Sequence, residues 1–176
     1  MEKTLFILVV FLFSLTHVFA QETYTIYPIP HEQKALAGTT SFTQQVIVVA
    51  DANIDQATID RAVQVLTERG LDAVVSAKAS AKNSNVFLGV KSALKIEGKY
   101  DRHDLVLSGK KKADVRIVGE NSDATFCGLA SLEQILDRGT TNLPCVSIKD
   151  YADVQYRGVI EGYYGVPYNA DVTKDI

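Results

Sequence analysis

The stretch 46–70, VIVVADANIDQATIDRAVQVLTERG, determines the predicted fold because it joins a strand directly to a helix. Residues 46–50 form a continuous, mostly β-branched apolar run, which is typical of a strand covered on both faces. From about Asp55 to Arg69, apolar side chains recur every three or four residues, which predicts an amphipathic helix. Gly70 follows where a left-handed helix cap belongs. The sequence therefore predicts a strand–helix unit.

Shorter apolar runs on both sides of this unit predict further strands. These strands are expected at residues 23–27, 73–75, 86–90, 104–108, 115–119 and 145–148. In residues 76–85 the apolar side chains follow neither the spacing of a helix nor that of a strand, which predicts a solvated loop. The run 110–112 is three lysines between two predicted strands, and we interpret it as a hairpin turn with solvated charge rather than an anion-binding patch.

A second helix is predicted from about Asp123 to Arg138. Asn121 is a capping candidate before it, and Gly139 follows it. Leucines at intervals of three and four residues give this helix one apolar stripe. Two long helices among several strands, with a hairpin in the second half, predict an α+β fold: a mixed β-sheet with helices mainly on one face.

The first twenty residues are typical of a cleaved export signal. Lys3 precedes the apolar run 5–15, and 18–20 is Val-Phe-Ala, with modest residues at the positions that a signal peptidase reads. The apolar run is shorter than the ~20 residues that span a bilayer. We therefore expect a periplasmic or extracellular protein with no membrane span after cleavage near Gln21.

Composition and length exclude several classes of protein. The chain has 176 residues and a formal net charge of -3 without a basic block, so a nucleic acid partner is not expected. A complete (β/α)8 barrel needs ~250 residues. His31 and His103 lie far apart in polar segments, so we predict no metal site, and we expect no cofactor. For Cys127 and Cys145, two buried free thiols and a disulfide both remain open.

The segment 156–168, YRGVIEGYYGVPY, carries the functional pattern. A short strand is predicted from Arg157 to Glu161, after a polar stretch at 149–155 that we interpret as a linker. Glycines bracket two tyrosines, which permits close backbone approach, and the rings offer stacking and hydrogen bonds that suit a sugar. Aromatic residues beside glycines are also common in structural turns, so the residues alone favour the structural interpretation.

Residues 157–167 resemble the first barrel strand and loop of glycoside hydrolase family 84, the bacterial O-GlcNAcases and hyaluronidase-like β-N-acetylglucosaminidases. Residues 123–136, 143–144 and 148–150 resemble the end of the small α+β domain that precedes the barrel in families 84 and 20, and 27–30 fits its start. Family 20 enzymes continue differently after the Arg-Gly pair, so family 84 is the better match. The chain differs from the family 84 pattern at two places: Ala152 stands where a proline is usual, and Tyr168-Asn169 stands where Trp-Ser is common.

The resemblance implies an exported β-N-acetylglucosaminidase that this chain represents in part. The implied division is a signal peptide at 1–20, an α+β accessory domain of the family 20b type at 21–149, and at 150–176 a linker with the first strand and loop of a truncated (β/α)8 barrel. The reaction would be retaining, with the substrate's own acetamido oxygen as nucleophile. In the family, two adjacent aspartates on a later barrel strand assist it, so the chain should be inactive alone.

Site residues follow position by position from the same resemblance. Gly162 and Tyr164 match positions that line the pocket for the acetamido sugar, and Glu161 would support them through hydrogen bonding. No catalytic residue is expected within the chain, and Asp150 and Asp153 are expected to be structural or solvated. The partner would be a glycan or glycoprotein that contains N-acetylglucosamine.

Two other interpretations compete with this one. The chain could be an exported carbohydrate-binding or interaction module without catalysis, although such a module has no need of the barrel-type strand at 157–161. It could also belong to a family 20 β-N-acetylhexosaminidase, which the loop at 161–165 opposes.

Overall fold

The structure, a computed structural model, describes residues 24–158. Within this range the chain forms seven strands and two helices. In chain order these elements are β1 (Glu32–Thr40), β2 (Gln45–Ala50), α2 (Gln56–Thr67), β3 (Asp72–Val75), β4 (Ser84–Val90), β5 (Tyr100–Ser108), β6 (Asp114–Gly119), α3 (Ser122–Leu136) and β7 (Leu143–Ala152).

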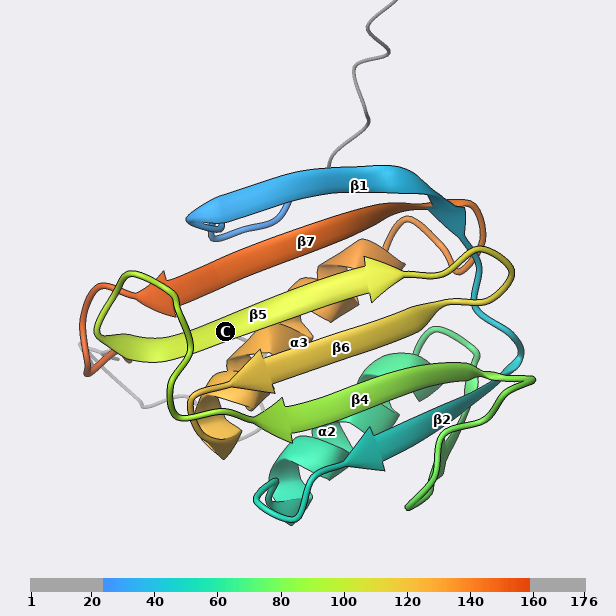
Figure 1. The fold of residues 1–176 in the computed structure, drawn as a ribbon, viewed down its shortest axis with the longest axis horizontal. Coiled ribbons are helices and arrows are strands. Elements are labelled where there is room, and N and C mark those ends of the chain that lie inside the picture. Colours follow the sequence, from blue (N-terminus) through green and yellow to red (C-terminus); the bar gives the residue numbers. More distant parts are fainter. Residues whose placement is uncertain (1–23, 159–176) are drawn as a thin grey trace, which may run out of the picture.

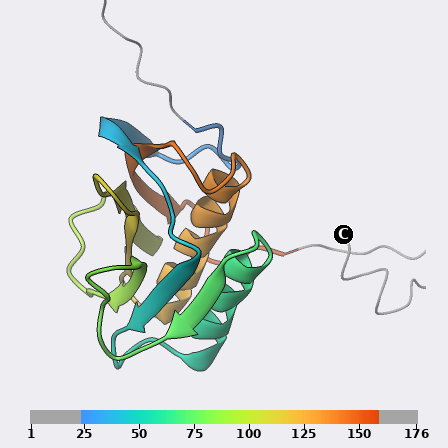
Figure 2. The ribbon, with the colours of Figure 1, turned by 90° about the vertical axis from the view of Figure 1, so that its right-hand side faces the viewer.

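All seven strands belong to one mixed sheet, in the order β1-β7-β5-β6-β4-β2-β3. The strands β3, β2, β4 and β6 are parallel neighbours, whereas β5 and β7 pair antiparallel with each other and with β6 and β1. Both helices cover the same face of the sheet (Figures 1 and 2). The predicted α+β fold, a mixed sheet with helices on one face, is confirmed.

Both predicted helices are present, and local signals set their ends. The Asp55 side chain accepts a hydrogen bond from the Thr58 backbone N–H at 2.8 Å and caps α2. Asn121 caps α3 in the same way, through the Ala124 N–H. Gly70 and Gly139 have φ of +76° and +107°, the left-handed backbone expected after each helix.

A single apolar core fills the space between the sheet and the helices. At Gly128 of α3 the helix approaches the sheet so closely that a Cβ atom would lie 2.5 Å from Ile117 Cγ2. Thr125 is fully buried in the first turns of α3; its hydroxyl donates to the Gly89 carbonyl at 2.8 Å and accepts from the Gly119 N–H at 3.0 Å. These contacts fix α3 on the ends of β4 and β6.

The predicted hairpin is confirmed, because β5 and β6 pair antiparallel on either side of residues 109–113. Lys112 forms an ion pair with Asp114 at 2.7 Å in this turn. The predicted strands at 46–50, 73–75, 86–90, 104–108, 115–119 and 145–148 all lie within observed strands.

The predicted strand at 23–27 is wrong for the residues that the structure describes, since 24–27 form no strand. Tyr24 and Ile26 are nevertheless buried, and the Tyr24 hydroxyl donates to the Pro144 carbonyl at 2.8 Å. The alternation therefore reflects an extended segment packed on the core. The edge strand β1, which the sequence analysis did not identify, lies farther along the chain.

The predicted linker at 149–155 is wrong in its first part, because β7 continues to Ala152. There Tyr100 of β5 lies opposite Ala152, and this pairing extends both strands beyond their apolar centres. Of the predicted barrel strand 157–161, only Arg157 and Gly158 are described, and neither is in a strand. The remainder, like the predicted export signal at 1–20, lies outside the described residues.

Among the described residues, neither α2 nor α3 is long and apolar enough to cross a membrane.

Candidate functional site

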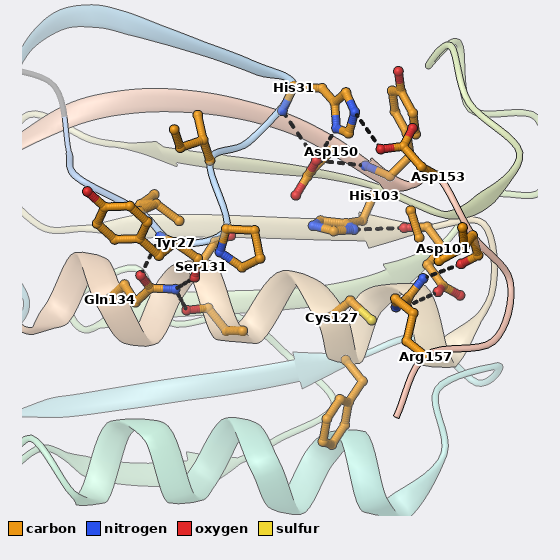
Figure 3. A pocket seen from close by; sticks show the side chains of 18 of the residues that line it. Tyr27, His31, Asp101, His103, Cys127, Ser131, Gln134, Asp150, Asp153 and Arg157 are labelled. Atoms are coloured by element: carbon orange, nitrogen blue, oxygen red, sulfur yellow. Dashed lines mark hydrogen bonds and ion pairs between the residues drawn. The ribbon is translucent and has the colours of Figure 1, made fainter. Parts of the chain in front are cut away.

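A cavity of about 630 Å³ lies along the outer side of α3 (Figure 3). Four separate parts of the chain line it: the segment 26–31, the start of β5, the helix α3, and the end of β7 with the residues that follow, 150–157. Arg61 of α2 completes the lining. The cavity is therefore a product of the tertiary fold.

Strand register explains why these segments meet. Both β1 and β5 pair with β7, with Glu32 opposite Lys149 and His103 opposite Asp150. His31, immediately before β1, therefore reaches the same end of β7 as His103. The two histidines, which the sequence analysis separated, line one cavity.

His31 forms a compact polar cluster at the upper edge of Figure 3. Its Nδ1 lies 2.7 Å from Asp150 Oδ1, which also accepts the His31 backbone N–H at 3.2 Å. Its Nε2 lies 3.7 Å from a carboxylate oxygen of Asp153. The imidazole stacks on the Tyr151 ring with 3.7 Å between centroids. Asp150 and Asp153 therefore hold the His31 imidazole at the edge of the cavity.

Tyr151 is enclosed on another side by Gly98, whose φ is +124°. A Cβ atom at Gly98 would overlap the Tyr151 ring, so only glycine permits the loop before β5 to cover that ring. The ring is thereby held between the loop and His31.

A second polar cluster lies where the described chain ends. One Arg157 guanidinium nitrogen donates to the Asp101 carboxylate and the other to the Val154 carbonyl at 2.8 Å. The hydrogen bond that Arg157 donates to the Asp101 carboxylate raises the pKa of Arg157. These contacts join the last described residues to the start of β5.

His103 belongs to β5 and is 5% exposed, and its ring lies against Gly128 of α3. Its Nδ1 is 2.8 Å from the Asp101 carbonyl, and its Nε2 has no hydrogen-bond partner in the described part of the chain. The Gly128 backbone allows the ring to fit here, since a Cβ atom would lie 3.2 Å from His103 Cδ2.

Both cysteines are free thiols, which decides the alternative left open by the sequence. Cys127 is partly buried on the cavity wall, and burial followed by the Asp101 carboxylate raises its pKa. Cys145 is buried within β7, and burial raises its pKa as well. Neither thiol is activated as a nucleophile.

Apolar side chains surround the polar clusters. Tyr27, Ile29, Phe126 and Val154 all line the cavity and are 69%, 78%, 42% and 56% exposed. The Gln134 side chain holds the backbone of Tyr27 from both sides, with its oxygen accepting the N–H and its nitrogen donating to the carbonyl, each at 2.8 Å.

Three carboxylate side chains line the cavity: Asp101, Asp150 and Asp153. Each lining carboxylate already pairs with a basic group: Asp101 with Arg157, and Asp150 and Asp153 with His31. These pairs hold the lining carboxylates in position. Within the described residues, no group of three or more His, Cys, Asp or Glu side chains is arranged to hold a metal ion.

The sugar-binding residues named from the sequence, Gly162 and Tyr164, lie outside the described residues, as does Glu161. Their role stays a prediction. The cavity was not predicted from the sequence, although one feature pointed to it. Residues 149–155, interpreted as a linker, contain two aspartates, a tyrosine and a valine, an unusual mixture for a solvated spacer.

The sequence of this domain matches a known family of protein domains. The family described as glycosyl hydrolase family 20, domain 2, matches residues 23–151. This range covers the whole seven-stranded sheet and both helices except the last residue of β7.

Solved structures agree with this match. CpGH84D superimposes with a TM-score of 0.76 and 29% identity over 88% of this chain, and CpGH84B with 0.66 and 22% over 87%. A chitobiase from Flavobacterium johnsoniae shares the fold, with a TM-score of 0.55 and 18% identity over 75% of the chain. The resemblance to the N-terminal domain of family 84 proteins is therefore confirmed.

The chain spans about a quarter of the length of these relatives. It covers 28% of CpGH84D, 27% of CpGH84B and 21% of the chitobiase.

Proposed function

Because the chain belongs to the family described as glycosyl hydrolase family 20, domain 2, we propose that it is the N-terminal part of an exported β-N-acetylglucosaminidase of the family 84 type. The likeness to CpGH84D, 29% identity at a TM-score of 0.76 over 88% of the chain, carries this proposal. An accessory domain from a glycoside hydrolase is the coarser conclusion, and the family match itself provides it.

The proposed enzyme removes terminal β-linked N-acetylhexosamine from a glycan or glycoprotein. Its reaction retains the anomeric configuration because the substrate's acetamido oxygen attacks first and water follows. The assisting aspartates belong to a later barrel strand, so the 176-residue chain binds part of the sugar without cleaving it. Gly162 contributes its backbone to that sugar pocket and Tyr164 its ring and hydroxyl.

Residues 1–20 direct the protein out of the cytoplasm, to the periplasm or beyond. This location fits a glycan substrate, and the apolar run at 5–15 supports it.

Two products of the gene test the proposal: the chain that ends at Ile176, and whatever product the gene encodes when it is read beyond that residue. We expect the longer product to release nitrophenol from the nitrophenyl β-N-acetylglucosaminide, and the chain ending at Ile176 to release none. A stop codon after Ile176, a longer product without hydrolysis, or hydrolysis by the short chain would each contradict the proposal.

A matched pair of variants in the longer product tests the site. Tyr164→Phe removes one hydroxyl from the proposed pocket, and the loss of one hydrogen bond to a sugar predicts a fall of about tenfold in kcat/KM. Tyr156→Phe makes the same chemical change on a side chain that is 87% exposed, and kcat/KM should stay unchanged. Equal activity of the two variants would remove Tyr164 from the site.

A further inference from the structure

Exposed apolar side chains are concentrated on one surface of the described domain. Tyr27, Ile29, Phe126 and Val154 line the cavity beside α3, and Tyr156 follows within two residues of Val154. A cluster of this kind, bordered by charged residues, marks a site of contact with another protein surface. We call the surface formed by Tyr27, Ile29, Phe126 and Val154 the α3 surface.

The described chain ends at this same surface. Arg157 lines the cavity, and its bonds to Asp101 and to the Val154 carbonyl fix the direction in which Gly158 leaves. Figure 3 shows Arg157 and Asp101 beside Cys127 of α3. Whatever follows Gly158 therefore starts within a few residues of exposed apolar side chains.

We propose that the α3 surface is the docking site for the polypeptide that follows Gly158, beginning with residues 159–176 of this chain. The inference rests on the proposed function, because the main part of that polypeptide is the proposed barrel. The surface would thus form the interface between the accessory domain and the catalytic domain.

The length of a relative and the covalent link after Gly158 both favour the following polypeptide as the occupant of the α3 surface. The chain spans only 28% of CpGH84D, so that protein contains much more polypeptide than the corresponding domain. A covalent tether of a few residues gives a millimolar effective concentration, which favours the following polypeptide over a second copy or a separate partner. Residues 159–160 are Val-Ile, whose side chains match an apolar surface.

The polar clusters are compatible with being covered. A buried charge is costly when it is unpaired, whereas here Asp150 already pairs with His31 and Asp101 with Arg157. Gln134 likewise satisfies the Tyr27 backbone before any contact forms. Docking can therefore remove water from the apolar side chains without leaving these groups unpaired.

Cys127 provides a direct measurement of docking, because it lies on the cavity wall and is a free thiol. We would label both products of the gene with a maleimide at one fixed pH and follow the Cys127 peptide by mass spectrometry. We expect Cys127 to react at least tenfold more slowly in the longer product than in the chain ending at Ile176. Cys145, which is buried in β7, should react slowly in both and reports that the domain is folded.

A pair of variants locates the contact. In the longer product, Phe126→Asp places a charge in the α3 surface and should restore rapid labelling of Cys127. Val75→Asp places the same charge on β3, away from the cavity, at a side chain that is 51% exposed, and should leave Cys127 protected. Continued protection of Cys145 shows that each variant is folded.

Equal rates of Cys127 labelling in the two products would overturn the docking proposal. Protection of Cys127 in the short chain that increases with protein concentration would also overturn it, because that result identifies a second copy as the occupant. An active longer product with a reactive Cys127 overturns the docking alone. An inactive longer product with a protected Cys127 overturns the proposed function alone. A stop codon after Ile176 overturns both.

Discussion

At the residue scale, the buried carboxylate of Asp104, which lies outside the cavity, lowers the stability of the fold. One of its carboxylate oxygens is buried and has no hydrogen-bond partner among the described residues. Burial raises the pKa of Asp104, and Lys149 opposes the shift only in part. The folded state therefore binds this proton more tightly than the unfolded state does, so ionised Asp104 opposes folding.

The sign of that shift predicts the effect of Asp104→Asn. The stability linked to protonated Asp104 is fully present below its unfolded pKa of about 3.9 and is lost as the pH rises through the higher folded value. Since asparagine does not ionise, the variant should be more stable than the parent at pH 7, and this advantage should disappear at about pH 3.5. Urea unfolding at both values measures the difference.

Asp72→Asn is the matched control, because this residue is exposed on β3. It makes the same chemical change where no buried carboxylate is removed, so its effect on the free energy of unfolding should be small. An advantage of Asp104→Asn that is the same at both pH values would contradict the assignment of the effect to ionisation.

Residues whose roles are set by near neighbours could be predicted from the sequence. Asn121 caps α3 through a contact three residues away, and Gly139 takes its left-handed backbone from the end of the same helix. The cluster of His31 and Asp150 could not be predicted, because the two lie 119 positions apart in the sequence and only strand pairing brings them together.

At the scale of elements, Thr125 joins α3 to two strands through a single hydroxyl. Thr125→Val keeps the shape but leaves the Gly119 N–H and the Gly89 carbonyl without this partner in a fully buried position. Each unsatisfied buried group costs about 1–3 kcal/mol, so we expect a loss of about 2–4 kcal/mol in the free energy of unfolding. Urea titration followed by circular dichroism measures it.

Thr125→Ser retains the hydroxyl and loses one buried methyl group, which predicts a loss of about 1 kcal/mol. Serine must therefore be the milder change. If valine were tolerated as well as serine, the hydroxyl would have no part in attaching the helix.

The strands differ in how far their sequences identify them. β2 is a run of buried apolar residues and was predicted, whereas β1 contains Lys34, Gly38 and several exposed positions and was missed. β1 is an edge strand with an irregularity between Ala35 and Thr39, and its pairing with β7 defines it. Edge strands need no apolar alternation, so composition does not reveal them.

At the scale of the whole molecule, the sheet brings distant parts of the chain together. β1 and β7 are neighbours although they are the first and the last strand of the described chain (Figure 1). The fold class followed from the local patterns of helices and strands. The cavity depends on this long-range pairing and on the register of β5 with β7, which no local pattern encodes.

The molecule's stability comes from one shared core rather than from a cross-link. The buried core joins residues of β2, β4, β5, β6 and β7 with both helices, Ala73 of β3 packs against it, and the two cysteines remain unpaired. This arrangement holds even for the proposed export to an oxidising compartment, where a disulfide could form. A domain of this size buries enough surface to fold without a covalent bridge.

We therefore predict two reactive thiols per chain when the purified protein is denatured in urea without reductant, corresponding to Cys127 and Cys145. The melting temperature should be the same with and without reductant, because no loop is closed by a disulfide in the native state. A thiol reagent and a thermal scan make both measurements. Thiols that appear only after reduction, together with a lower melting temperature in reductant, would show that a bridge contributes to the fold.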